Sequence, residues 1–148
     1  MHYLLLVTMD RRHAKTSTTA RRSVLERLYA IPSFVAGEDG QTWSIADWFV
    51  IGGRFTGLLS DGRQTTWLPK VYAELTAPRD PHRDLGYEDD AQIVDQVLYD
   101  RLLAPYARQN MRYDRSEGHL AFLDLDGDPV APTTFIARKW LVVVDYHS

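Results

Sequence analysis

Basic and hydroxyl side chains are concentrated near the start of the chain, where only Asp10 and Glu26 oppose them. The basic residues are Arg11, Arg12, Lys15, Arg21, Arg22 and Arg27. Arginine donates paired hydrogen bonds to phosphate oxygens, and the free N–H groups at a helix start favour an anion. With Thr16, Ser17 and Thr18 as further donors and N-cap candidates, the segment predicts an anion site at the entrance of a helix. The competing interpretation is a solvated loop, because no Walker-type Gly-Lys-Thr spacing is present.

The second candidate site is the Gly52-Gly53 pair, which Arg54 follows directly. Two runs rich in apolar residues flank it, Trp48–Ile51 and Phe55–Leu59, and they predict a β-hairpin with the glycines in its turn. Glycine allows a positive φ and a close approach of backbone to ligand. The turn therefore presents Arg54 either to an anion or to solvent alone.

This stretch resembles a motif of small uncharacterised phage and bacterial proteins: Asp-Trp, three residues, Gly-Gly-Arg, two residues, Gly. The match covers residues 47–57. The resemblance implies that Asp47, Trp48 and Arg54 act as a set, and it implies no particular activity. It also suggests a phage protein, for which sequestering a host signalling nucleotide is a sensible role.

Two other patterns carry less information. The run Asp124-Leu125-Asp126-Gly127-Asp128 resembles a phosphatase nucleophile motif and the start of an EF-hand loop, but Pro129 stands where the EF-hand needs glycine, so a plain turn is predicted. The histidines show no paired spacing, and no metal site or cofactor is predicted. The tryptophans can stack on a nucleotide base, although core packing explains most of them equally well.

The composition is that of one globular domain over residues 1–148. A net charge of -3 argues against binding to double-stranded DNA, and no apolar run is long enough to span a membrane. The absence of cysteine excludes disulfides and thiol chemistry and fits a cytoplasmic location.

Hydrophobic periodicity predicts an α+β domain with a ferredoxin-like β-α-β-β-α-β order and an inserted loop or hairpin. The expected strands are His2–Met9, Trp48–Ile51, Phe55–Leu59, His119–Leu125 and Lys139–Tyr146. The expected helices are one ending near Ala30, one over Glu88–Ala104 and a short one near Lys70–Leu75. In this plan both helices cover one face of an antiparallel sheet, and the open face makes a homodimer a candidate assembly.

We therefore expect a non-enzymatic binder of an anionic, nucleotide-like small molecule. The predicted ligand-binding residues are Arg11, Arg12, Lys15, Thr16, Ser17, Arg21, Asp47, Trp48, Gly53 and Arg54. No catalytic residue is assigned. One alternative is a phosphodiesterase or transferase that uses His13, His82 or His119. The other is a protein-interaction module that uses the sheet face or the acidic helix at residues 88–104.

Overall fold

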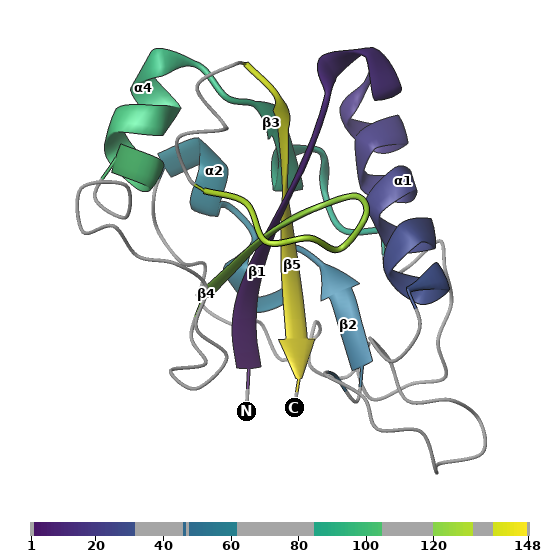
Figure 1. The fold of residues 1–148 in the computed structure, drawn as a ribbon. Helices are drawn as coiled ribbons and strands as arrows, with labels where there is room; N and C mark the ends of the chain where they lie inside the picture. Colours follow the sequence, from purple (N-terminus) through teal and green to yellow (C-terminus); the bar gives the residue numbers. More distant parts are fainter. Residues whose placement is uncertain are drawn as a thin grey trace, which may run out of the picture.

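The computed structural model of the chain describes residues 2–31, 46, 48–61, 85–104, 120–131 and 138–147. At its centre is a mixed five-stranded sheet (Figure 1). The strands are β1 (His2–Met9), β2 (Trp48–Ile51), β3 (Ala91–Ile93), β4 (Leu120–Asp124) and β5 (Trp140–His147). The helices are α1 (Ser17–Ala30), α2 (Leu58–Asp61) and α4 (Gln96–Leu98), and a π-helical segment, Tyr99–Leu103, continues α4. The predicted α+β class is confirmed.

The strand β5 lies inside the sheet and is paired along both of its edges. On one edge it runs antiparallel to β1, from His2 opposite His147 to Met9 opposite Trp140. β4 lies beyond β1 and is parallel to it. The strand order is therefore β2-β5-β1-β4, with β3 also paired to β5.

The second edge of β5 is occupied by two short strands placed end to end. Ile51 of β2 lies opposite Val144, and Ala91 of β3 lies opposite Val142. Between them the Gly52 N–H donates to the carbonyl of Val143, with an N···O distance of 2.8 Å. The chain thus leaves this edge after Gly52, and Ala91 returns to it at the next pairing position along β5. We call β2, Gly52 and β3 together the interrupted strand.

Alternate side chains of β1 and β5 enter two separate cores. On one face Val7 and Val142 pack with Val24 of α1, and on the other Leu6 and Val143 pack with Leu98 of α4. Figure 1 shows α1 on one side of the sheet, with α2 and α4 on the other. Because both faces are buried, β1 and β5 are nearly continuous in apolar residues.

The ferredoxin-like order is not confirmed. That plan places both helices on one face of an antiparallel sheet, whereas here β1 and β4 are parallel and helical segments cover both faces. The physical reason is that the apolar side chains of β1 and β5 point to both sides and require cover on both. The open face on which the homodimer expectation rested is therefore covered by the second core.

The hairpin predicted around the Gly-Gly pair is wrong in its second half. Trp48–Ile51 is a strand, but Gly53–Phe55 forms a 3₁₀ turn and Leu58–Asp61 forms α2. Phe55 and Leu59 are both buried in the core that contains Leu98. Side chains four residues apart share one side of a helix and one face of a strand alike, so this spacing could not distinguish the two structures in the sequence.

The helix predicted over Glu88–Ala104 is wrong in its first half. Glu88–Asp90 forms a 3₁₀ turn and Ala91–Ile93 forms β3, because an open position on β5 accepts these residues as a strand. Helix begins only at Gln96. The short helix predicted near Lys70–Leu75 lies outside the described residues.

The other predicted elements are confirmed. The strand His2–Met9 has the predicted bounds, and the first helix ends at Ala30. The predicted strands near the end of the chain correspond to β4 and β5. The turn at Asp126-Gly127 is also present, and the Gly127 N–H donates to the carbonyl of Asp124 with an N···O distance of 3.1 Å.

Gly52 has a backbone conformation that only glycine adopts without strain. Its φ is +74° and its ψ is −77°, close to the γ-turn with positive φ. A Cβ at this position would overlap the carboxylate of Asp90 and would lie 2.5 Å from Thr56 Oγ1. Glycine is therefore required here both for its dihedral angles and for the approach of Asp90.

We expect Gly52→Ala to destabilise the protein by about 3 kcal/mol or more, since strain and steric overlap add. Gly127→Ala is the matched control, because Gly127 also has a positive φ (+82°) but a Cβ there would meet only the mobile end of Ile31, at 3.1 Å. The free energy of unfolding of this control should fall by about 1–2 kcal/mol. Urea unfolding of both variants measures the difference, and equal losses would contradict the role assigned to Asp90.

Candidate functional site

At the start of α1 the predicted anion-binding hydroxyls are engaged by the protein itself. Thr16 is the N-cap, and its Oγ1 accepts from the Thr19 N–H at 3.2 Å. Ser17 Oγ donates to the carbonyl of Glu88 at 2.6 Å. These bonds complete the helix start and join it to the turn before β3, which accounts for both residues structurally.

Arg21 is buried, with only 6% of its surface exposed. Its guanidinium donates to the carbonyls of Leu85 and Gly86, both at 3.0 Å, and to the hydroxyls of Ser17 and Thr18, both at 3.1 Å. Burial lowers the pKa of Arg21. Four hydrogen bonds offset the cost of removing the guanidinium from water. Arg21 therefore ties α1 to residues 85–86.

The Gly53-Arg54 turn is organised around a buried carboxylate. Asp145 of β5 is fully buried, and its Oδ2 accepts from the Arg54 backbone N–H at 2.8 Å. A Cβ on Gly53 would lie 2.5 Å from the same oxygen. The glycine in this position thus makes room for Asp145, and the Arg54 side chain is exposed.

The sequence-predicted site residues are divided between the two ends of β5. Trp48 is half-buried and stacks on His147 at one end, with ring centroids 5.3 Å apart. The connection from β1 to α1 lies at the other end, where Trp140 Nε1 donates to the carbonyl of Ala14 at 2.9 Å. This connection carries the exposed side chains of Arg11, Arg12 and Lys15. Asp47 lies outside the described residues.

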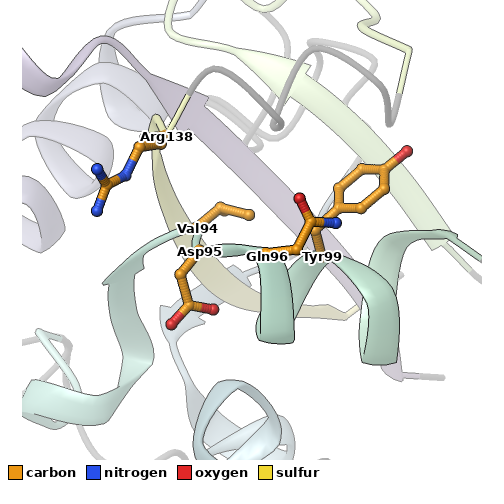
Figure 2. A pocket seen from close by; sticks show the side chains of 5 residues that line it. All are labelled: Val94, Asp95, Gln96, Tyr99 and Arg138. Atoms are coloured by element: carbon orange, nitrogen blue, oxygen red, sulfur yellow. The ribbon is translucent and has the colours of Figure 1, made fainter.

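A pocket of about 330 Å³ lies at the Trp140 end of β5 (Figure 2). It forms where the chain leaves β3 and enters β5, since the Val94 N–H donates to the carbonyl of Lys139 with an N···O distance of 2.9 Å. Its volume is at the small end of the range for ligand pockets. The described lining residues are Val94, Asp95, Gln96, Tyr99 and Arg138.

A change in helix geometry places Tyr99 in this pocket. Asp95 caps α4 by accepting from the Leu98 N–H at 2.8 Å, and the helix then widens into the π-helical segment that Tyr99 begins. π-helical segments are rare in proteins as a whole, but those that occur are often found at functional sites. Only 9% of the Tyr99 surface is exposed, and its hydroxyl has no hydrogen-bond partner within the part of the chain that the structure describes.

Arg138 is the single non-glycine residue with a positive φ (+57°) in the described ranges. An L-residue in this region is strained by roughly 1–2 kcal/mol. Strain of this kind is concentrated at active sites and ligand clamps. This strained arginine also lines the pocket, and its side chain is exposed.

Positive charge collects at this end of the sheet although the whole chain is acidic. Asp10 forms ion pairs with Arg12 at 3.5 Å and Lys139 at 3.6 Å. Among the described residues, Arg11, Lys15 and Arg138 have no carboxylate within ion-pair distance. Arg138 and Asp95 offset each other within the described lining, so the excess of positive charge at this end comes from Arg11 and Lys15.

All five lining residues were missed as site residues in the sequence. Asp95 is the N-cap of α4, and its side chain accepts from the Leu98 N–H. An aspartate in the middle of residues 88–104 is a sequence signal that a helix starts there and not at residue 88. The pair Arg138-Lys139 directly before an apolar strand is a second signal. No sequence pattern indicates the positive φ of Arg138 or the π-helical geometry at Tyr99.

The chain matches no protein-family model, no curated protein and no solved structure. None of the helices in the described ranges is both long and apolar enough to cross a membrane. No three histidine, aspartate or glutamate side chains among the described residues are grouped so as to hold a metal ion. The geometry of the pocket is therefore the basis for the function proposed below.

Asp90 is fully buried where the chain returns to the interrupted strand. Its Oδ2 accepts from the Tyr87 N–H at 2.8 Å and from Thr56 Oγ1 at 3.2 Å, while Oδ1 has no partner among the described residues. Burial raises the pKa of Asp90, and the two hydrogen bonds and the charge of Arg21 offset only part of this effect. The folded chain therefore keeps the Asp90 proton to a higher pH than the unfolded chain does.

We expect the free energy of unfolding to contain a contribution from Asp90 that is complete below its ordinary pKa of 3.8 and is lost as the pH rises through the raised value. Asp90→Asn cannot titrate, so it should gain in stability relative to the wild type between pH 4 and 8. Urea unfolding across this range measures the difference. Asp89→Asn keeps the Asp90 carboxyl and should keep most of the pH dependence, because burial raises the pKa of Asp90 more than the Asp89 charge does. A pH-independent difference for Asp90→Asn would refute the assignment.

Proposed function

We propose that this protein binds a small anionic molecule of nucleotide-like form, without converting it, in the pocket at the Trp140 end of β5. The observation that supports the proposal most strongly is the lining of the pocket. It combines an exposed arginine, Arg138, with the ring of Tyr99 and the side chain of Val94. In Figure 2 Arg138 and the Tyr99 ring lie on opposite sides of the view, which suits a ligand with an anionic group at one end and a ring at the other.

Each part of such a ligand has a counterpart in the pocket. The Arg138 guanidinium can donate two parallel hydrogen bonds to a phosphate or carboxylate. Because only 9% of the Tyr99 surface is exposed, a ligand ring contacts its exposed edge and gains less than the roughly 1–3 kcal/mol of full stacking. Arg11 and Lys15, at the same end of the sheet, raise the local concentration of anions. Two of the predicted ligand-binding residues thus keep a part in the proposal, although they are not in the described lining.

The lining favours binding over catalysis. Asp95 is the one carboxylic acid in the described lining, and it accepts the N–H that caps α4. Of the histidines in the enzymatic alternative, His13 lies exposed in the 3₁₀ turn Arg11–His13, and the other two lie outside the described residues. Retention of an unaltered nucleotide fits the sequestering role that the Gly-Gly-Arg motif suggests.

We expect Arg138→Ala to weaken nucleotide binding by about 10- to 100-fold, the usual effect of losing a hydrogen bond to a charged group. Arg138→Lys keeps the positive charge, so its affinity for nucleotides should fall less than that of Arg138→Ala. Arg27→Ala is the control, because Arg27 pairs with Asp126 at 3.1 Å and is not in the described lining. Isothermal titration calorimetry with nucleoside monophosphates compares the three variants.

Native mass spectrometry with mono-, di- and cyclic nucleotides tests the proposal as a whole and reports the oligomeric state in the same spectrum. A retained, unaltered nucleotide supports binding. A nucleotide that is consumed to a product favours the phosphodiesterase or transferase alternative. If no nucleotide binds, or if Arg138→Ala binds as tightly as the wild type, the proposal for this pocket is wrong.

A further inference from the structure

The connection from β1 to α1 is fixed against the start of β5 by two contacts. Just beyond the end of the β1–β5 ladder, Asp10 Oδ1 forms an ion pair with Lys139 Nζ at 3.6 Å. Trp140 Nε1 donates to the carbonyl of Ala14 at 2.9 Å, and both residues are buried. The connection therefore keeps a defined position beside the residues that lead into β5.

The next residue on each chain segment is an arginine. Arg11 follows Asp10 and Arg138 precedes Lys139, so both arginines lie one step beyond the ion pair, away from the ladder. Both side chains are exposed, and neither has a carboxylate within ion-pair distance among the described residues. Like charges at neighbouring positions of two strands destabilise a sheet, and the positive φ of Arg138 adds strain. An anion that contacts both side chains would remove the repulsion.

The direction of the Arg138 side chain agrees with this arrangement. In Figure 1 the end of β1, the start of α1 and the start of β5 lie at the same end of the sheet, at the top of the view. In Figure 2 the Arg138 side chain extends away from the Tyr99 ring, toward the purple ribbon of the segment that contains α1. The anionic group of a ligand on Arg138 therefore lies on the side of the pocket where the β1–α1 connection passes.

The acidic side chains nearest to the two arginines are engaged elsewhere. Asp10 divides its two oxygens between Arg12, at 3.5 Å, and Lys139, at 3.6 Å. The turn after β4 reaches the other end of α1, where Asp126 pairs with Arg27 at 3.1 Å. Neither of these acids therefore neutralises the arginines beyond the ladder.

Lys15 is less suited to the same anion than Arg11 is. Ser17 Oγ donates to the carbonyl of Glu88, which brings the exposed Glu88 and Asp89 to the start of α1. Lys15 is close to Ser17 in the chain, whereas Arg11 lies at the far end of the connection. We therefore assign the second anion contact to Arg11.

Resting on the function proposed above, we propose that Arg11 and Arg138 together bind a pyrophosphate group, so that the site prefers nucleoside di- and triphosphates to monophosphates. Arginine donates paired hydrogen bonds to phosphate oxygens, and two arginines can each bind one of two linked phosphates. The pocket, of about 330 Å³, is at the small end of the range for ligand pockets. It holds the nucleoside part, and the phosphate chain leaves it across Arg138 toward Arg11.

The variant that tests this role most directly is Arg11→Ala, and Arg12→Ala is its matched control. Arg12 lies in the same 3₁₀ turn and is also exposed, but its guanidinium pairs with Asp10. The two variants remove the same charge from neighbouring positions. A difference between them therefore reports a direct contact and not the general attraction of an anion to positive charge.

The experiment is calorimetric titration of the wild type and both variants with AMP, ADP and ATP. We expect the wild type to bind ADP about 10-fold or more tightly than AMP. Arg11→Ala should lose about 10-fold for ADP and ATP and stay within about 3-fold for AMP. Arg12→Ala should stay within about 3-fold for all three nucleotides.

Thermal unfolding without ligand supplies a second readout. Because Arg11 and Arg138 repel each other in the unliganded protein, Arg11→Ala should leave the Tm unchanged or slightly raised. Added ADP should then raise the Tm of this variant less than that of the wild type. A purely structural role of Arg11 predicts the opposite, namely a lower Tm without ligand.

Two kinds of failure are distinguishable. If the wild type binds AMP as tightly as ADP, or if Arg11→Ala and Arg12→Ala weaken ADP binding to the same extent, the pyrophosphate site is wrong and the anion-binding function stands. If the wild type binds none of the three nucleotides, the proposed function fails and the pyrophosphate site fails with it.

Discussion

The pairing of β5 with two separate segments along a single edge is the constraint on which the rest of the structure depends. Gly52 and Ala91 occupy successive positions beside β5, although residues 53–90 separate them in the chain. A sheet edge imposes both spacing and direction on whatever pairs with it. The bounds of β2 and β3 therefore fix where this excursion leaves the sheet and where it returns.

Two buried acidic side chains fill the junction of this arrangement. Asp90 and Asp145 each take the space that a side chain on Gly52 or Gly53 would fill, and each accepts a backbone N–H. Asp90 directly precedes β3, and the pocket begins directly after β3, at Val94. The lining of the pocket is therefore positioned by a three-residue strand whose other end is anchored by a buried acid.

The sequence predicts the parts of the fold that depend on local pattern, and it fails where pairing with distant strands decides the outcome. The apolar runs of β1 and β5 and the cap at Thr16 are strong local signals. Residues 91–93 fit a helix by spacing but pair with β5 instead. Likewise Arg21 resembles a phosphate ligand in sequence, and only the fold shows that the carbonyls of Leu85 and Gly86 accept its protons. The pocket could not be predicted, because its walls come from segments far apart in the chain.

The antiparallel pairing of β1 and β5 has a mechanical consequence. His2 lies opposite His147, so both outer ends of this pair are at the same end of the sheet. A force that pulls residues 2 and 147 apart would load the ladder from that end and break its hydrogen bonds one after another. A strand pair resists stretching best when the force acts on all of its hydrogen bonds at the same time. This geometry does not allow that, because the force reaches the ladder from one end only. The two central strands of the sheet would therefore be peeled apart by a small force applied at their outer ends.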